Sequence, residues 1–298
     1  MPRRPDGRPA DRGAARAPDA GETPAGIVPS LVLDVDPAGP SPARPDGGLV
    51  RVEPVMGTVV SIDVRDRDVP PAALDRALAY LHDIDRRFSP YRDDSEVSRL
   101  GSGTLALDDA SRDVRWVMGL CDELARLTAG YFDARRFRLD GMRDPTGVVK
   151  GWAVEEAALD LVDAGARNFI VNCGGDIVAR GGPEPGSALP WRVGIRHPRQ
   201  PDRVAGVVEV RDLAVATSGT YERGEHVVDP HTGAPATDLV SLTVVGPSLT
   251  YADAYATAAF AMGRRGPAWL AGIDGYEGFA ITADDLTLAT PGMAAYLR

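Results

Sequence analysis

Apolar residues repeat with a helical spacing in the first half of the chain and again near its end. Residues 71 to 88 follow a proline, and their leucines, isoleucine and phenylalanine lie three or four positions apart. This spacing predicts an amphipathic helix, and proline is compatible with its first turn. The same reasoning predicts helices over 111–128, 149–164 and 251–262, a short helix ending at Leu100-Gly101, and another near 267–271.

Short runs rich in Val and Ile predict strands between these helices and after them. The run 49–64 is broken at Met56-Gly57-Thr58, which indicates either one bent strand or a hairpin. Further strands are expected at 168–172, 191–196, 204–210, 214–217 and 241–245, with a closing hairpin at 279–281 and 287–289. Because helices and strands come in unequal runs rather than as a βα repeat, we expect the α+β class, with mixed or antiparallel sheets packed with helices.

The first 47 residues differ in composition from the rest. They are rich in Pro, Gly, Ala, Arg and Asp, and such a segment buries too little apolar surface to offset its ordering entropy. We expect residues 1–47 to be a disordered extension, with one short strand at most around 27–33, and residues 48–298 to form the folded domain. No apolar stretch follows Arg3-Arg4, and no lipoprotein-type cysteine stands near the start, so we expect a cytoplasmic protein.

The charge balance narrows the range of ligands. Acidic residues outnumber basic ones 43 to 33, for a net charge of −10, which argues against nucleic acid or an anionic membrane as a partner. No apolar stretch is long enough for a membrane-spanning helix. An anionic ligand would need local neutralisation, for which a metal ion is the obvious candidate. Lys150 is the only lysine, which suggests a specific role for it. Cys121 and Cys173 lack metal-ligand spacing and are expected to be buried thiols.

One candidate site lies on the alanine-rich helix predicted at 251–262. Asp253 and Thr257 are four residues apart, so their oxygen atoms project from one helical face. A carboxylate and a hydroxyl in this relation can bind a hard divalent cation. The spacing alone equally allows an Asp in a first helical turn, stabilised by the helix dipole, and a Thr bonded to the helix backbone.

A second candidate is the segment from Asp144 to Gly151, which leads into a helix. Backbone amides at a helix start attract anions, and Lys150 would add a positive charge for phosphate. A turn with an exposed lysine is the alternative. A third is Asn172-Cys-Gly-Gly-Asp176, whose glycines permit either close approach of a ligand or an ordinary turn.

His226 lies in a fourth segment, between Ala216-Thr-Ser-Gly219 and Asp229-Pro-His-Thr-Gly233. A histidine titrates near neutrality, so it can act as acid, base or phosphate partner. A structural role is the alternative.

In this order and at these distances, the segments resemble the FAD:protein FMN transferase (ApbE) family from about residue 50 to 290. The matching pieces are Met56-Gly-Thr58, Phe88-Ser-Pro-Tyr91-Arg-Asp-Asp-Ser95-Glu-Val-Ser-Arg-Leu100, Gly130-Tyr-Phe-Asp133, Lys150-Gly-Trp-Ala-Val-Glu155, Asn172-Cys-Gly-Gly-Asp176, Ala216-Thr-Ser-Gly219, His226-Val-Val-Asp-Pro230 with Thr232-Gly233, and Ala252-Asp-Ala-Tyr-Ala-Thr257.

The resemblance implies an ApbE-like, T-fold-related architecture and a reaction. Enzymes of this family cleave FAD, transfer its FMN half to a Thr or Ser hydroxyl of a target flavoprotein, and release AMP. The acceptor usually carries an Asp-Gly-Ala-Thr/Ser-like motif. Because this is phosphoryl transfer, catalysis would rest on positioning and charge neutralisation, with Mg²⁺ as the expected metal.

Carried over position by position, the resemblance implies a set of site residues. The Mg²⁺ ligands would be Asp253, Thr257 and a backbone carbonyl at or near Gly147. The FAD site would be lined by Met56, Tyr91, Tyr131, Phe132, Asp133, Asp144, Lys150, His226 and Val227. Lys150 is expected to hold phosphate, and His226 to contact phosphate or exchange a proton, so that these two and Asp253 are the candidate catalytic residues.

Two other functions share most of these features. With water as the acceptor, the same site would make a metal-dependent FAD pyrophosphatase that yields FMN and AMP. A non-catalytic FAD-binding protein is the third possibility, although a binding protein has no need of Asp253, Thr257 and Lys150 together.

Overall fold

The computed structural model describes residues 27–28, 47–135, 143–200, 202–220 and 227–298. Its centre is an 8-stranded sheet in the order β11-β10-β9-β8-β5-β4-β3-β2, whose neighbouring strands all run antiparallel. The strands are β2 (Leu49–Val55), β3 (Thr58–Val64), β4 (Phe169–Cys173), β5 (Asp176–Arg180), β8 (Ala214–Gly219), β9 (Leu239–Gly246), β10 (Glu277–Thr282) and β11 (Thr287–Ala289).

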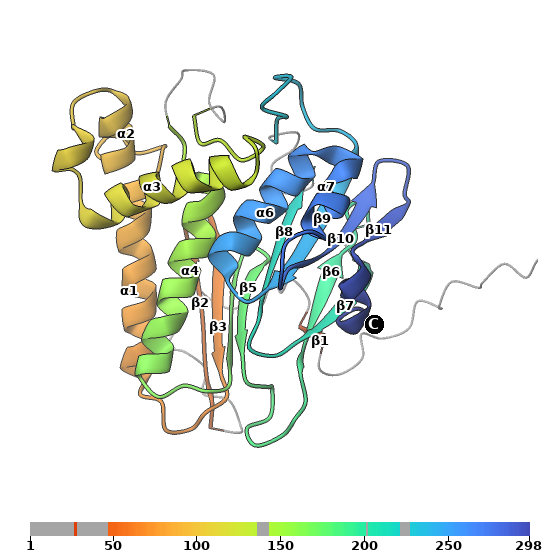
Figure 1. The fold of residues 1–298 in the computed structure, drawn as a ribbon. Helices are drawn as coiled ribbons and strands as arrows, with labels where there is room; N and C mark the ends of the chain where they lie inside the picture. Colours follow the sequence, from red (N-terminus) through yellow and green to blue (C-terminus); the bar gives the residue numbers. More distant parts are fainter. Residues whose placement is uncertain (1–26, 29–46, 136–142, 201, 221–226) are drawn as a thin grey trace, which may run out of the picture.

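Helices lie along one face of this sheet, with α1, α4 and α6 side by side (Figure 1). The helices are α1 (Pro71–Phe88), α2 (Glu96–Gly101), α3 (Arg112–Leu127), α4 (Thr146–Asp163), α6 (Leu249–Ala261) and α7 (Gly266–Leu270), with short 3₁₀ turns η1 (Leu107–Asp109), η2 (Gly263–Arg265) and η3 (Pro291–Ala295). The apolar stripe of α1 is buried as its spacing predicts.

A smaller 3-stranded sheet covers part of the opposite face. It has the order β1-β6-β7, with β1 (Ile27–Val28), β6 (Trp191–Arg196) and β7 (Val204–Val210). Side chains alternate between the two faces of the large sheet: on β4, Val171 packs with the helices, whereas Ile170 packs with the small sheet. The molecule therefore has two apolar layers on either side of one sheet, and the expected α+β class is confirmed.

The run 49–64 is a hairpin. Val55 pairs with Thr58, so Met56 and Gly57 form a two-residue turn, with φ of 56° and 71°. Positive φ at both positions is the type I′ geometry that suits twisted antiparallel strands. The β4–β5 turn packs beside it, since a Cβ on Gly174 would lie 2.6 Å from Oγ1 of Thr58.

Two features differ from the sequence expectation. The helix α4 begins at Thr146, three residues before the expected start, because Asp144 Oδ1 accepts a hydrogen bond from the Thr146 amide and supports the first turn. Lys150 consequently lies inside the helix. The strand β5 is not expected from the sequence pattern, because the glycine pair before it suggests a loop and its apolar run is short.

The N-terminal segment is described only at Ile27–Val28, which pair in parallel with β6, and at Gly47. The rest of the expected disordered extension lies outside the described residues. Within the described ranges, none of the helices combines the length and apolar character needed to cross a membrane. Both cysteines are buried, and burial raises the pKa of the Cys121 thiol to about 12.

Candidate functional site

The helices α4 and α6 meet at Gly151 and Asp253. A Cβ on Gly151 would lie 2.8 Å from both the Cβ of Asp253 and the carbonyl oxygen of Leu249, so only glycine permits this approach. The Gly151 amide donates to Oδ2 of Asp253 across 3.0 Å. Asp253 is buried, with 6% of its surface exposed, and this bond fixes its carboxylate at the contact between the helices.

A second bridge between the same helices lies one turn along. The N-terminus of α6 has no side-chain cap of its own. Instead Glu155 of α4 accepts hydrogen bonds from the hydroxyls of Ser248 and Thr250, at 2.8 and 2.5 Å, and from the amides of Leu249 and Thr250, at 3.2 and 3.1 Å. A carboxylate at this position satisfies otherwise unpaired amides and is favoured by the helix dipole. The register of α6 against α4 is thereby set.

Thr257 lies one helical turn after Asp253, as the sequence predicts. Its hydroxyl is 3.4 Å from that of Ser218 on β8. Thr257 remains partly exposed whereas Asp253 is buried. The pair therefore combines a buried carboxylate, which the Gly151 amide holds, with a partly exposed hydroxyl on the same helix.

Gly147 occupies the first turn of α4. In a regular helix its carbonyl accepts the amide of residue 151, which is the amide that donates to Asp253. Gly147 therefore lies one turn before the α4–α6 contact, on the helix that carries Lys150.

Lys150 forms an ion pair with a buried carboxylate. Its Nζ lies 2.6 Å from Oδ2 of Asp176, whose side chain is only 1% exposed, compared with 21% for Lys150. The other carboxylate oxygen, Oδ1, accepts the amide of Thr217 at 3.2 Å. Asp176 begins β5 and Thr217 lies on β8, so the lysine is connected to the middle of the large sheet.

The glycine pair before Asp176 forms a tight turn that places this carboxylate. Gly174 and Gly175 have φ of 59° and 95°, which favour glycine. The Gly175 amide donates to Oδ1 of Asn172 across 2.9 Å. The turn is thus stabilised internally, which agrees with the interpretation of the glycines as an ordinary turn, while close approach of a ligand stays a prediction.

The segment after α3 contributes aromatic and acidic groups. Phe132 is fully buried, and its amide donates to the Thr128 hydroxyl at 2.9 Å. The Tyr131 hydroxyl accepts a hydrogen bond from Arg265 at 2.7 Å, and its ring lies edge-on to that of His231, 4.5 Å between centroids. Asp133 pairs with Arg135.

The other residues expected to line the FAD site lie on different turns and loops of the fold. Met56 is in the β2–β3 turn, Asp144 precedes α4, and Val227 is buried with its carbonyl bonded to the Ala236 amide. Tyr91 is 87% exposed in the loop between α1 and α2. His226 lies outside the described residues, so its predicted role stays a prediction.

Asp176 and Glu155 are the functional candidates whose contacts sequence reasoning missed. Both stand inside segments quoted for the family resemblance, but the sequence does not indicate that one pairs with Lys150 and the other caps α6. For Asp176 the signal in the sequence is an acidic residue at the start of an apolar run, and for Glu155 an acidic residue inside a predicted helix, and ordinary surface positions give both signals.

The residues present fit a magnesium ion. Across the described ranges no three His, Cys, Asp or Glu side chains gather as metal ligands, so a site made of side-chain carboxylates or imidazoles alone is not found there. Asp253 and Thr257 instead offer one carboxylate and one hydroxyl, and Gly147 a backbone carbonyl. Mg²⁺ prefers such oxygen donors, usually few from protein and the rest from water and phosphate.

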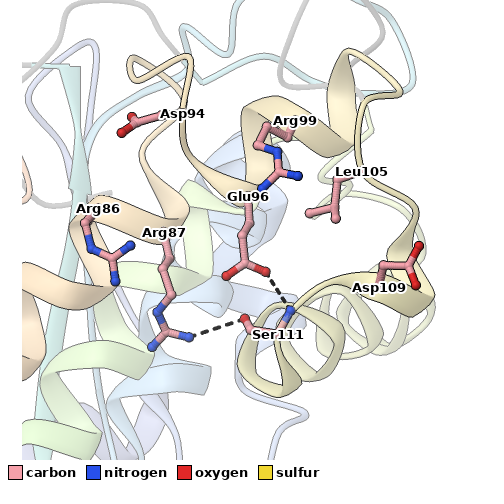
Figure 2. Close-up of a pocket in the computed structure, with 8 residues that line it drawn as sticks. All are labelled: Arg86, Arg87, Asp94, Glu96, Arg99, Leu105, Asp109 and Ser111. Atoms are coloured by element: carbon pink, nitrogen blue, oxygen red, sulfur yellow. Dashed lines mark hydrogen bonds between the residues drawn. The ribbon is translucent and has the colours of Figure 1, made fainter.

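A separate polar pocket lies between the end of α1, α2 and the start of α3 (Figure 2). This cavity of about 370 Å³ is lined by Arg86, Arg87, Asp94, Glu96, Arg99, Leu105, Asp109 and Ser111. We call it the α1–α3 pocket. Glu96 accepts the Ser111 amide at 2.6 Å, and Arg87 pairs with Asp83 and Asp113, both at 2.8 Å. Its positive and negative side chains balance one another.

The model of the ApbE family matches residues 56–139 and 135–279, well over half of the chain. The chain belongs to the ApbE family. The matched ranges contain both sides of the α4–α6 contact and the Lys150–Asp176 pair, so the site described above lies inside the ApbE region.

Curated ApbE relatives carry the name FAD:protein FMN transferase. The protein of Vibrio cholerae is 38% identical over 131 residues, which are 41% of this chain and 39% of that protein. The protein of Treponema pallidum is 35% identical over 172 residues, 52% of this chain and 48% of that protein. The chain thus aligns with less than half the length of these ApbE relatives.

The solved structure of the flavin transferase ApbE from Vibrio cholerae has the same fold. It superposes with a TM-score of 0.73 at 24% identity, over 84% of this chain and 99% of that chain. The expected ApbE-like architecture is confirmed.

Proposed function

We propose that the protein is a Mg²⁺-dependent FAD:protein FMN transferase, which passes FMN from FAD to a Thr or Ser hydroxyl of a target flavoprotein. One observation carries the proposal. Lys150, the only lysine, lies on α4 directly before Gly151, whose amide binds Asp253 of the Asp253–Thr257 pair on α6. A positive group for phosphate and oxygen donors for a metal are what cleavage of a pyrophosphate requires. The names of the curated relatives agree with it.

In this reaction the acceptor oxygen forms a bond to the phosphorus of the FMN half. The bond from that phosphorus to the bridging oxygen breaks, and AMP leaves with this oxygen. Lys150 would bind phosphate oxygens, and Asp253, Thr257 and the Gly147 carbonyl would hold the metal. When bound, Mg²⁺ would neutralise phosphate charge and favour the leaving group. The hydroxyl proton must pass to a base, and we propose His226 for this role or for contact with phosphate.

The FAD molecule would extend from Lys150 towards the surrounding turns. We propose Met56, Tyr91, the segment 131–133, Asp144 and Val227 as its lining. The proposed acceptor is a flavoprotein with an Asp-Gly-Ala-Thr/Ser-like motif. The cytoplasmic location expected from the sequence stays a prediction, which cell fractionation would test.

The test is incubation of the purified protein with FAD and Mg²⁺, with and without a target protein bearing Asp-Gly-Ala-Thr. Mass spectrometry follows the target and chromatography follows AMP, with Asp253→Ala as control. We expect the target to gain one FMN, and the variant to give none. AMP and free FMN without target modification would instead indicate a pyrophosphatase, and FAD binding without AMP a binding protein.

A further inference from the structure

The two side chains of the Lys150–Asp176 pair differ in how deeply they are buried. The Asp176 side chain is 1% exposed and the Lys150 side chain 21% exposed, so the carboxylate lies inside the fold while the lysine side chain keeps partial contact with solvent. Within the described part of the chain, no hydrogen bond of standard geometry reaches Oδ2 of Asp176. The ion pair with Lys150 is therefore the contact there that compensates the buried charge.

The carboxylate itself is fixed by the sheet. The backbone amide of Thr217 holds Oδ1 at 3.2 Å. The Thr217 hydroxyl has a different partner, the hydroxyl of the buried Thr243 on β9, at 2.9 Å. Asp176 opens β5, which pairs with β8. A rigid sheet thus determines where Oδ2 lies, and Oδ2 determines where the end of a long, flexible lysine side chain lies.

A buried ion pair of this kind is an inefficient way to gain stability, because desolvation of the two charges offsets much of their attraction. It is an effective way to orient a lysine, whose side chain otherwise samples many rotamers. An ammonium has three N–H donors, so a bond to Asp176 is compatible with donation to phosphate oxygens.

We propose that Asp176 is a positioning residue of the FMN transfer site, which holds the Lys150 ammonium in the place where it binds the phosphate. The proposal rests on the proposed function. Asp176 does not touch the reacting atoms in this account: it acts through Lys150. Its loss therefore affects turnover more than affinity, because a displaced donor still attracts FAD but no longer matches the transition state.

The single lysine gives a direct measurement that needs no catalysis. Protein grown with ¹³C-labelled lysine has one lysine spin system, that of Lys150. In the wild-type protein we expect an ordered side chain, with distinct shifts for the two Hε protons and slow ¹³Cε motion. Asp176→Asn, which removes the negative charge but can still accept the Thr217 amide, should give a mobile, free-lysine signal.

Turnover and FAD affinity are then measured on the same samples. For Asp176→Asn we expect a loss of kcat of about 10–100-fold with the Kd of FAD changed less than about threefold. Thr243→Val is the matched control: it removes the neighbouring side-chain hydrogen bond on the same sheet but leaves the pair, and should retain the ordered signal and the wild-type kcat.

Three results would overturn the proposal: a free-lysine signal in the wild type, an ordered signal in Asp176→Asn, or equal losses of kcat in Asp176→Asn and Thr243→Val. If Asp176→Asn does not fold, Lys150→Arg tests the same point, since it keeps the charge and moves the donors. Full turnover by Lys150→Arg would contradict a requirement for position. Absence of transfer by the wild type would refute the proposed function instead, while the lysine spectra would still decide the ion pair.

Discussion

The protein has two regions where charged side chains gather, and they are built differently. In the α1–α3 pocket, Arg87 forms ion pairs with Asp83 and Asp113 and donates a hydrogen bond to the Ser111 hydroxyl. Arg86 also pairs with Asp83. The charges there are numerous, and several of them are exposed. We call the second region the α4–α6 site: Lys150, Glu155, Asp176, Asp253 and Thr257. There the charged side chains are fewer, and the almost fully buried Asp176 forms an ion pair with Lys150.

The difference shows why a cavity does not by itself indicate a functional site. In the α1–α3 pocket a ligand would compete with an existing network, and losing one surface ion pair changes little, typically about 0–1 kcal/mol. In the α4–α6 site the buried carboxylates of Asp176 and Asp253 are held by specific contacts, and loss of a counter-charge there leaves a buried charge without compensation. A functional site is therefore expected where charged side chains are buried and held by specific partners.

The largest effect is expected from Asp253→Ala. It removes the carboxylate at the helix contact, so FMN transfer should fall by at least about 100-fold. Calorimetry with Mg²⁺ alone should show weakened binding. An unchanged Mg²⁺ affinity would remove Asp253 from the proposed metal site, whatever the activity.

Lys150→Met should destabilise the protein, because it leaves Asp176 buried without its counter-charge. Allowing for the partial exposure of Lys150, we expect a loss of about 2–3 kcal/mol in the free energy of unfolding, measured in urea.

The double variant Lys150→Met with Asp176→Leu should recover most of that loss while remaining inactive. Equal stability of the single and double variants would show that the carboxylate is compensated in another way.

Gly151→Ala tests the close approach of α4 and α6. The added methyl would meet Asp253 and the Leu249 carbonyl, and we expect a loss of about 1–3 kcal/mol together with lower turnover.

Gly119→Ala is its matched control in α3, because a Cβ there meets nothing within 4 Å. This change should stabilise the protein by about 0.5–1 kcal/mol, as seen by thermal unfolding. A loss of similar size in both variants would contradict the special role of Gly151.

The smallest effects are expected in the α1–α3 pocket. Arg87→Gln should cost about 0.5–1 kcal/mol, and Arg99→Gln, at an exposed position, less. Neither should change FMN transfer under saturating FAD. A large fall in turnover of either variant would mean that the two charged regions are not as independent as their contacts indicate.

The sequence predicted the elements with local signals and missed those without them. The helix α1 has the expected bounds because proline at its start and a regular apolar stripe both lie within it. The strand β5 is short and follows two glycines, so its identity depends on pairing with β4 and β8. The Asp253–Thr257 spacing and the isolated lysine could be found by reading along the chain. Their partners could not, since Gly151 and Asp253 are 102 residues apart.

The carboxylate of Glu155 that caps α6 has a consequence for folding. Its bonds to residues 248–250 span 93 to 95 positions. The ends of the chain segment between the two helices, which contains β4 to β9, must therefore come together before the first turn of α6 gains its partners. Contacts of this range stabilise the chain only after the entropy of bringing distant segments together has been lost. The oxygen donors of Asp253 and Thr257 would then reach their final relation to Gly147 only after α4 has docked, and a nascent or unfolded chain would present no assembled cation site.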